Sequence, residues 1–145
     1  MAVPTDPQAL ARACAEAMWA DDAASRELGM VLEAVGPGRA VMAMPVTAAM
    51  VNGHGLCHGG YIFTLSDSAF AFACNTYNDR AVAAQCSITY LRPARLGDRL
   101  TATAAERARA GRQAIYDITV TTPDGTIIAE FRGHSRTTGG VFFKE

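Results

Sequence analysis

A single carboxylate stands in an otherwise apolar stretch of this sequence. Residues 61–74 read YIFTLSDSAFAFAC, and Asp67 carries the only formal charge among them. Apolar side chains nearly all round a helix predict that other structure wraps it. A buried carboxylate without a partner is costly, so such a group is typically kept for chemistry or neutralised by a raised pKa. Asp67 is therefore our first candidate for a general base or a nucleophile.

A glycine-rich loop, residues 52–60 (NGHGLCHGG), leads directly into that stretch. Gly59 and Gly60 stand at the expected helix start, where backbone N–H groups lack helical partners and the helix dipole is positive. Such an end can polarise a carbonyl or hold an oxyanion. Glycine there also permits close packing or an unusual turn. The two explanations are compatible, and we expect Gly59 to be an oxyanion donor.

The spacing between the acid and the glycines bears on the assembly. Asp67 lies eight residues beyond Gly59, which is about 12 Å along a helix axis at about 1.5 Å per residue. One small acyl group cannot contact both ends of that span within one chain. A second, antiparallel copy of the helix would bring its own acid beside this chain's glycine, and two-fold symmetry supplies that arrangement. If both elements are functional, the sequence favours an active site at a dimer interface.

Other polar residues near the loop have a structural and a functional interpretation. Asn52 either caps a turn or donates its amide to a reacting oxygen or water, and we expect the second. His54, Cys57 and His58 suggest a metal site, but the intervening glycines make no rigid ligand pair and no further ligands complete a tetrahedral set. We expect no metal. His58 is expected to shape the loop or bond near the helix start, with a direct catalytic role as the alternative.

Ser68 follows the acid directly. It either hydrogen-bonds a reacting water or carboxylate, or bonds to its own backbone, which is the ordinary role of a serine inside a helix. The sequence contains no G-x-S-x-G elbow, which argues against a serine nucleophile.

Taken together, Asn52, the triplet 58–60 and the run Leu65–Ala69 resemble the signature of hotdog-fold thioesterases, in particular the phenylacetate-degradation type. The similarity covers about residues 28–138. It implies an α+β fold in which an antiparallel sheet wraps a long central helix, and homodimers that pair into tetramers. It also implies hydrolysis of acyl-CoA thioesters with small aromatic acyl groups such as phenylacetyl, coenzyme A being part of the substrate and no cofactor being needed.

The resemblance also implies roles for single residues. The acid that matches Asp67 is a nucleophile or general base, the glycine that matches Gly59 supplies the oxyanion N–H, and Asn52 lies in the same pocket. The family often places a small hydroxyl residue at the position of Ser68. A hotdog dehydratase or hydratase, which would need His58 beside the acid, and a non-catalytic acyl-CoA-binding module are the alternatives.

Arginine makes up twelve of the thirteen basic residues. A solvated strand face explains most of the six between residues 92 and 112. Arginine forks suit phosphate oxygens, so we expect Arg95 and Arg112, beside predicted turns, to contact coenzyme A. Gly60 and Tyr61 are expected to line the substrate pocket.

Composition narrows the class of protein. Half of the 145 residues are hydrophobic and 19% are charged, which is typical of a globular chain. The net charge of −1 argues against nucleic acid as a partner, since phosphate binding needs a basic surface. Four cysteines without a C-x-x-C pair predict reduced thiols in a cytoplasmic protein. We expect neither a membrane span nor a secretion signal.

The elements that must position these residues follow from periodicity and turn residues. We expect one domain, 1–145, with a helix over about 6–20 that Asp6 caps and Pro7 begins. The pattern predicts strands over about 30–35, 39–46, 82–91, 99–109, 114–121 and 127–137, and the central helix over about 59–76. In the last strand, Ile127, Ala129 and Phe131 are expected to face the core. One helix followed by several closely spaced strands indicates α+β with a mostly antiparallel sheet.

Overall fold

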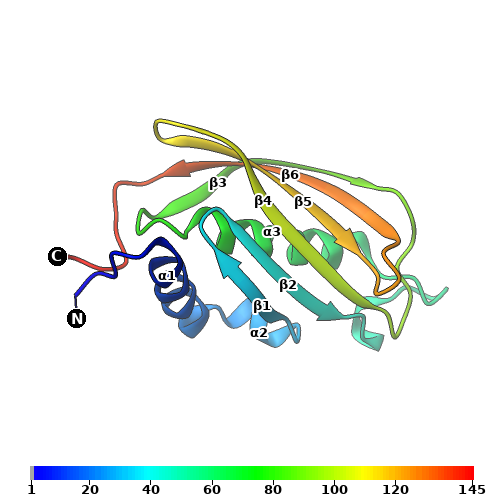
Figure 1. Ribbon diagram of the computed structural model, residues 1–145. Coiled ribbons are helices and arrows are strands. Elements are labelled where there is room, and N and C mark those ends of the chain that lie inside the picture. The colour runs from blue at the N-terminus through cyan, green and yellow to red at the C-terminus, as the bar shows by residue number, and fades with distance from the viewer. Residues whose placement is uncertain (1) are drawn as a thin grey trace.

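In the computed structural model, which describes residues 2–145, six strands form one antiparallel sheet that curves around a central helix (Figure 1). The strand order is β1-β2-β4-β5-β6-β3. The elements in chain order are α1 (Pro7–Asp21), α2 (Ala23–Glu27), β1 (Val31–Gly36), β2 (Arg39–Pro45), the 3-10 turn η1 (Ala48–Met50), α3 (Gly59–Cys74), β3 (Ala81–Tyr90), β4 (Arg99–Ala110), β5 (Gln113–Thr121) and β6 (Ile127–Thr137). The predicted α+β fold, with its wrapped helix and N-terminal helix, is confirmed.

The core lies between α3 and the concave face of the sheet. Leu65, Ala69 and Phe70 of α3 are buried, and the Phe70 ring packs on Tyr116 of β5 and Phe131 of β6 at centroid distances of 5.7 and 6.0 Å. These aromatic contacts fix the rotation of α3 about its axis. The residues of α3 that face away from the sheet are therefore determined by the core.

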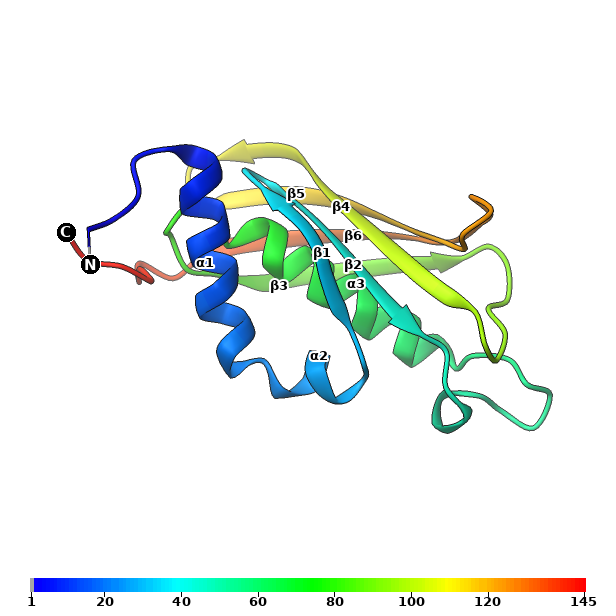
Figure 2. The ribbon, with the colours of Figure 1, turned by 60° about the horizontal axis from the view of Figure 1, so that its bottom comes forward.

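The N-terminal helix begins as its sequence predicts. The Asp6 carboxylate accepts a hydrogen bond from the Ala9 N–H at 2.9 Å, and Pro7 begins α1. Figure 2 shows α1 running beside the β1 edge of the sheet, with α2 below it. Trp19 of α1 reaches α3, where its ring lies 6.1 Å from that of Phe72. Helix α2, a short helix between α1 and β1, was not predicted from the sequence.

The prediction that Ile127 faces the core is wrong, since Ile127 is 37% exposed whereas Ile128 is 2% exposed. The register between β5 and β6 shifts where β6 begins, and such an irregularity moves the first residue out of the alternation. Ala129 and Phe131 are buried as predicted.

Strand β3 is an edge strand, and part of its apolar face is open. Cys86 and Ile88 are half-buried against the core, but Tyr90 on the same face is 47% exposed. The register shift between Ala83 and Gln85 places Val82 opposite Arg136 on the outer face, where it is 55% exposed. The outer edge of β3 pairs with no other strand of residues 2–145. Exposed apolar side chains beside an unpaired edge are typical of a surface that another chain covers.

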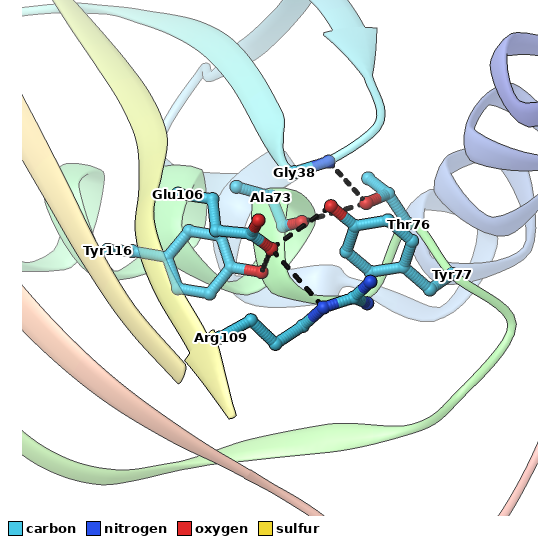
Figure 3. Close-up of polar contacts among 7 residues, drawn as sticks. All are labelled: Gly38, Ala73, Thr76, Tyr77, Glu106, Arg109 and Tyr116. Atoms are coloured by element: carbon cyan, nitrogen blue, oxygen red, sulfur yellow. Dashed lines mark hydrogen bonds and ion pairs between the residues drawn. The ribbon is translucent and has the colours of Figure 1, made fainter. Parts of the chain in front are cut away.

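A polar cluster ties the C-terminal end of α3 to β4. Figure 3 shows Glu106 accepting hydrogen bonds from the hydroxyls of Tyr77 and Tyr116, each at 3.0 Å. The Arg109 guanidinium lies over the Tyr77 ring, 3.7 Å from its centroid. Burial, aided by the nearby Glu106 charge, raises the pKa of the Tyr116 hydroxyl. This cluster lies at the opposite end of α3 from the glycine-rich loop.

Candidate active site

The N-terminus of α3 presents free backbone donors. His58 is the N-cap, with φ −61° and ψ 134°, and its side chain makes no capping bond. Within residues 2–145, the N–H groups of Gly59 and Gly60 donate to no backbone or side-chain acceptor. Two free amides at the positive end of a 16-residue helix can bind a polarised carbonyl oxygen.

Tyr90, at the end of β3, holds this helix start in place. Its hydroxyl donates to the Gly59 carbonyl at 2.8 Å. A Cβ added at Gly59 would lie only 2.9 Å from the Tyr90 Cζ, so the close approach requires glycine. Burial raises the pKa of the Tyr90 hydroxyl, which keeps it a donor. This role of Tyr90 was not predicted, because the alternating pattern of a strand indicates only which residues face the core.

The side chain of Asn52 and the β3–β4 connection hold the glycine-rich loop in place. The loop and this connection lie at the same end of the molecule (Figure 1). The Asn52 side-chain oxygen accepts from the N–H groups of His54 and Leu56 at 2.9 and 3.1 Å. Asn52 therefore does cap a turn, while its amide nitrogen donates to no group among residues 2–145 and stays exposed. Leu56 forms a backbone bridge to Arg95, which places that arginine beside the loop.

Asp67 lies on the other part of α3 and is half-buried. Burial raises the pKa of its carboxyl, and no hydrogen bond or ion pair from residues 2–145 offsets the effect. Its charge in turn contributes to the raised pKa of the Cys74 and Cys86 thiols, whose main cause is burial. The carboxylate is therefore near Cys86 of the edge strand β3. A desolvated carboxylate without a partner is a stronger base than an ordinary aspartate.

Ser68, the next residue, lies about 100° further round α3, on the side that faces α2. Its hydroxyl lies 2.8 Å from that of Ser25, which in turn donates to Asp22 at 2.6 Å. Asp22 and Ser25 were missed by the sequence analysis. The only signal for them is an Asp followed three residues later by a Ser, the pattern of a helix N-cap.

An open strip runs along α3 between β3 and α2. Its members are either exposed or half-buried: Gly60, Thr64, Asp67, Ser68 and Ala71. Gly59 and Asp67 share this helix, so within one chain the amide donors and the carboxylate lie about 12 Å apart along its axis. The free edge of β3 lies beside the strip.

The remaining residues singled out from the sequence fall into two groups. Gly60 is exposed at the helix start, and Tyr61 is half-buried against the core cluster. Arg112 lies in the turn between β4 and β5 at the far end of the sheet, where it donates to the Thr137 carbonyl at 2.9 Å. Within one chain, Arg112 is therefore not brought to the glycine-rich loop, whereas Arg95 is.

Two further kinds of feature were sought over residues 2–145: a metal site and a membrane-spanning helix. This range contains no group of three or more His, Cys, Asp or Glu side chains placed to hold a metal ion. None of its helices combines the length and the apolar character needed to cross a membrane.

Known proteins are similar to this chain in sequence. Residues 54–129 match the thioesterase superfamily. Acyl-coenzyme A thioesterase PaaI of Escherichia coli is 44% identical over 131 residues, which cover 90% of this chain and 94% of that protein.

Solved structures agree with the sequence comparison. The structure of E. coli PaaI, from the phenylacetic acid degradation operon, matches with a TM-score of 0.92 and 43% identity over 94% of this chain and 99% of that one. A Streptococcus mutans protein bound to acetyl-CoA matches with a TM-score of 0.74 and 28% identity over 77% of this chain and 90% of that one.

Proposed function

Since this chain belongs to the thioesterase superfamily and is a thioester hydrolase, we propose that it cleaves aryl-type acyl-CoA thioesters with Asp67 as the reactive carboxylate. One observation carries the assignment. Asp67 is a half-buried acid without a partner among residues 2–145, and burial raises its pKa. A structural aspartate would instead be expected to have a hydrogen-bond donor or a cation nearby.

The reaction needs a base, an electrophile and a leaving group. In the direct route, a water oxygen bonds to the thioester carbonyl carbon, Asp67 takes one water proton, and the carbon–sulfur bond breaks. The proton then passes to the coenzyme A sulfur, which leaves as a thiol, and the acid is released. In the alternative route, an Asp67 oxygen bonds to the carbonyl carbon and the carbon–sulfur bond breaks, which gives an anhydride and the coenzyme A thiolate; water then hydrolyses the anhydride, and one of its protons passes to the sulfur. Both routes use the same carboxylate and give the same products.

Negative charge develops on the carbonyl oxygen in either route. The N–H group of Gly59 is free, and Tyr90 holds this residue in place by donating to its carbonyl at 2.8 Å. We assign this N–H as the oxyanion donor, with the free amide of Asn52 available to the same oxygen or to the water. His58 lies beside them at the N-cap. Preorganised donors of this kind are worth most where water is excluded.

Two subunits would complete one site. The open strip of α3, which carries Asp67, lies beside the unpaired edge of β3, and the exposed Tyr90 flanks it. An antiparallel copy of α3 on that strip would bring its acid to this chain's Gly59 and exclude solvent from both. Pairing of such dimers into tetramers, and a cytoplasmic location consistent with four free cysteines, remain predictions.

Substrate recognition is divided between the loop and the sheet. Arg95 lines a hollow of about 470 Å³ between the β3–β4 connection and the turn that joins β5 to β6, and it is assigned to a coenzyme A phosphate. Arg112 can serve only if another subunit supplies it. The aryl preference rests on similarity to PaaI, whose structure is described as part of phenylacetic acid degradation. Gly60 and Tyr61 are assigned to the acyl end of the pocket.

The test is release of free thiol from aryl, short-chain and long-chain acyl-CoAs. Asp67→Asn should reduce kcat by about 10²- to 10⁴-fold, the usual contribution of a positioned base, without loss of folding. Asp21→Asn, an exposed acid on α1, is the matched control and should match the wild type. Thiol release by Asp67→Asn at the wild-type rate would refute the assignment. A hydratase would instead lose its activity with His58→Ala and release no thiol.

A further inference from the structure

The three Ser and Thr side chains of α3, at positions 64, 66 and 68, make different hydrogen bonds. Thr64 and Ser66 each donate to the carbonyl four residues earlier, at 2.8 and 2.9 Å. This is the ordinary bond of a hydroxyl inside a helix. Ser68 makes no such bond in the described structure, and its hydroxyl instead lies 2.8 Å from that of Ser25. Among these three residues, Ser68, which follows Asp67, is therefore the one whose hydroxyl does not bond to the helix backbone.

Ser25 is held on its other side by an acid. Its hydroxyl donates to Asp22 Oδ2 at 2.6 Å, while its backbone N–H donates to Asp22 Oδ1 at 3.0 Å. Asp22 is the N-cap of α2, and Ser25 is 1% exposed. Both carboxylate oxygens of Asp22 therefore accept hydrogen bonds from Ser25. Asp22 is the acceptor at one end of the hydrogen-bond chain Asp22–Ser25–Ser68.

Counting hydrogens settles the direction of the last bond. A hydroxyl has one hydrogen to donate, and an ionised carboxylate has none. The Ser25 hydrogen goes to Asp22, so the Ser25 oxygen must accept, and Ser68 must be the donor in the 2.8 Å contact. The Ser68 hydrogen is thereby occupied. Towards the open strip of α3, the Ser68 oxygen offers only lone pairs.

We propose that Asp22 and Ser25 are positioning residues that hold the Ser68 hydroxyl as a hydrogen-bond acceptor for the water that Asp67 deprotonates. This inference rests on the proposed thioester hydrolysis. The attacking water has two hydrogens. One goes to the Asp67 carboxylate as the oxygen bonds to the carbonyl carbon, and the other is accepted by Ser68. The role belongs to the direct route, because in the anhydride route Asp67 is acylated when water attacks and cannot take the water proton.

The direction of the Ser68–Ser25 hydrogen bond matters, because the opposite direction would lower the activity. A Ser68 hydroxyl free to rotate would donate to the nearest strong acceptor, and a carboxylate that accepts such a bond is a weaker base. It would also compete with water for Asp67. The Asp22–Ser25 pair removes that possibility by keeping the Ser68 hydrogen turned towards α2.

Asp22→Asn tests the direction without removing the contact. Asn is as good an N-cap as Asp, and its oxygen can still accept the Ser25 N–H. Its NH₂ then faces the Ser25 hydroxyl and donates, so Ser25 must donate to Ser68 and the Ser68 hydrogen is released. We expect kcat to fall about five- to tenfold, the size of one hydrogen bond, with KM and Tm unchanged. Asp21→Asn, with the same charge change one residue away, should leave kcat unchanged.

A double-mutant cycle separates positioning from a structural effect. Ser68→Ala should also lower kcat, and adding Asp22→Asn to it should cause no further loss. Ser25→Ala, which keeps the backbone bond to Asp22, should reproduce the loss of kcat and serves if Asp22→Asn does not fold. No loss in either Asp22→Asn or Ser25→Ala, or an equal loss with and without Ser68, would overturn the inference. Residual activity of Asp67→Asn at the wild-type level would instead overturn the proposed function, so the two failures are distinguishable.

Discussion

Gly59→Pro should remove the oxyanion donor while leaving the helix intact. Gly59 is the first residue of α3, a position where proline is favoured because its missing N–H has no helical partner. Proline also requires an extended residue before it, and His58 already has φ −61° and ψ 134°. The backbone therefore accepts proline, and the only backbone group that the change removes is the amide hydrogen.

The structural cost of the change comes from Tyr90. Any Cβ at Gly59 would lie 2.9 Å from the Tyr90 Cζ and 3.0 Å from its hydroxyl, so the ring must move and the 2.8 Å bond to the Gly59 carbonyl is lost. Tyr90 is 47% exposed and can swing outwards. We expect the free energy of unfolding to fall by about 1 kcal/mol, the worth of one hydrogen bond.

Gly59→Ala is the matched control, because it adds the same Cβ and keeps the N–H. The two variants should unfold at similar urea concentrations. Thiol release should differ: Gly59→Pro should lose about 10²- to 10³-fold in kcat, as expected for one oxyanion donor, and Gly59→Ala much less. Equal kcat values for the two variants would refute the assignment of this N–H.

Further predictions concern charge and packing. Because burial raises the pKa of Asp67, kcat/KM should fall on the acid side with a midpoint above 3.8, the ordinary aspartate value, and a lower midpoint would contradict its role as the base. The raised pKa makes ionised Asp67 destabilising, with a cost that grows as pH rises through the folded-state pKa and is absent below the unfolded value. Asp67→Asn should therefore raise Tm at pH 7 but not in strong acid. Gly133→Ala should lower the free energy of unfolding in urea by about 1–3 kcal/mol, because its Cβ would lie 2.7 Å from the Phe70 ring, whereas Gly53→Ala, with open space around it, should not.

Local patterns were sufficient for most of the fold. Proline at the first helical position, Gly36-Pro37-Gly38 between β1 and β2, and the turn at residues 122–125 each have a short-range physical cause, and the strand bounds follow from them. The lone acid and the free helix start were also visible, because both depend on residues near in sequence. The wrapped helix followed from its apolar composition.

Contacts between distant residues were not predictable. The Tyr90–Gly59 bond joins residues 31 apart, and the Ser25–Ser68 contact joins residues 43 apart. Each depends on how β3 or α2 packs against α3, which periodicity does not encode. Ile127 was misplaced for a related reason, since a register shift depends on the partner strand.

The central claim is that Asp67 of one subunit acts with Gly59 of another. The most direct measurement mixes two inactive variants, Asp67→Asn and Gly59→Pro, after joint unfolding and refolding. In a mixed dimer, one site combines the intact acid with the intact glycine, and the other site has neither. Random pairing makes half of the dimers mixed, so thiol release should recover to about a quarter of the wild-type rate, as two-fold symmetry requires. If activity stays at the mean of the two separate variants, each site lies within one chain and the account is wrong.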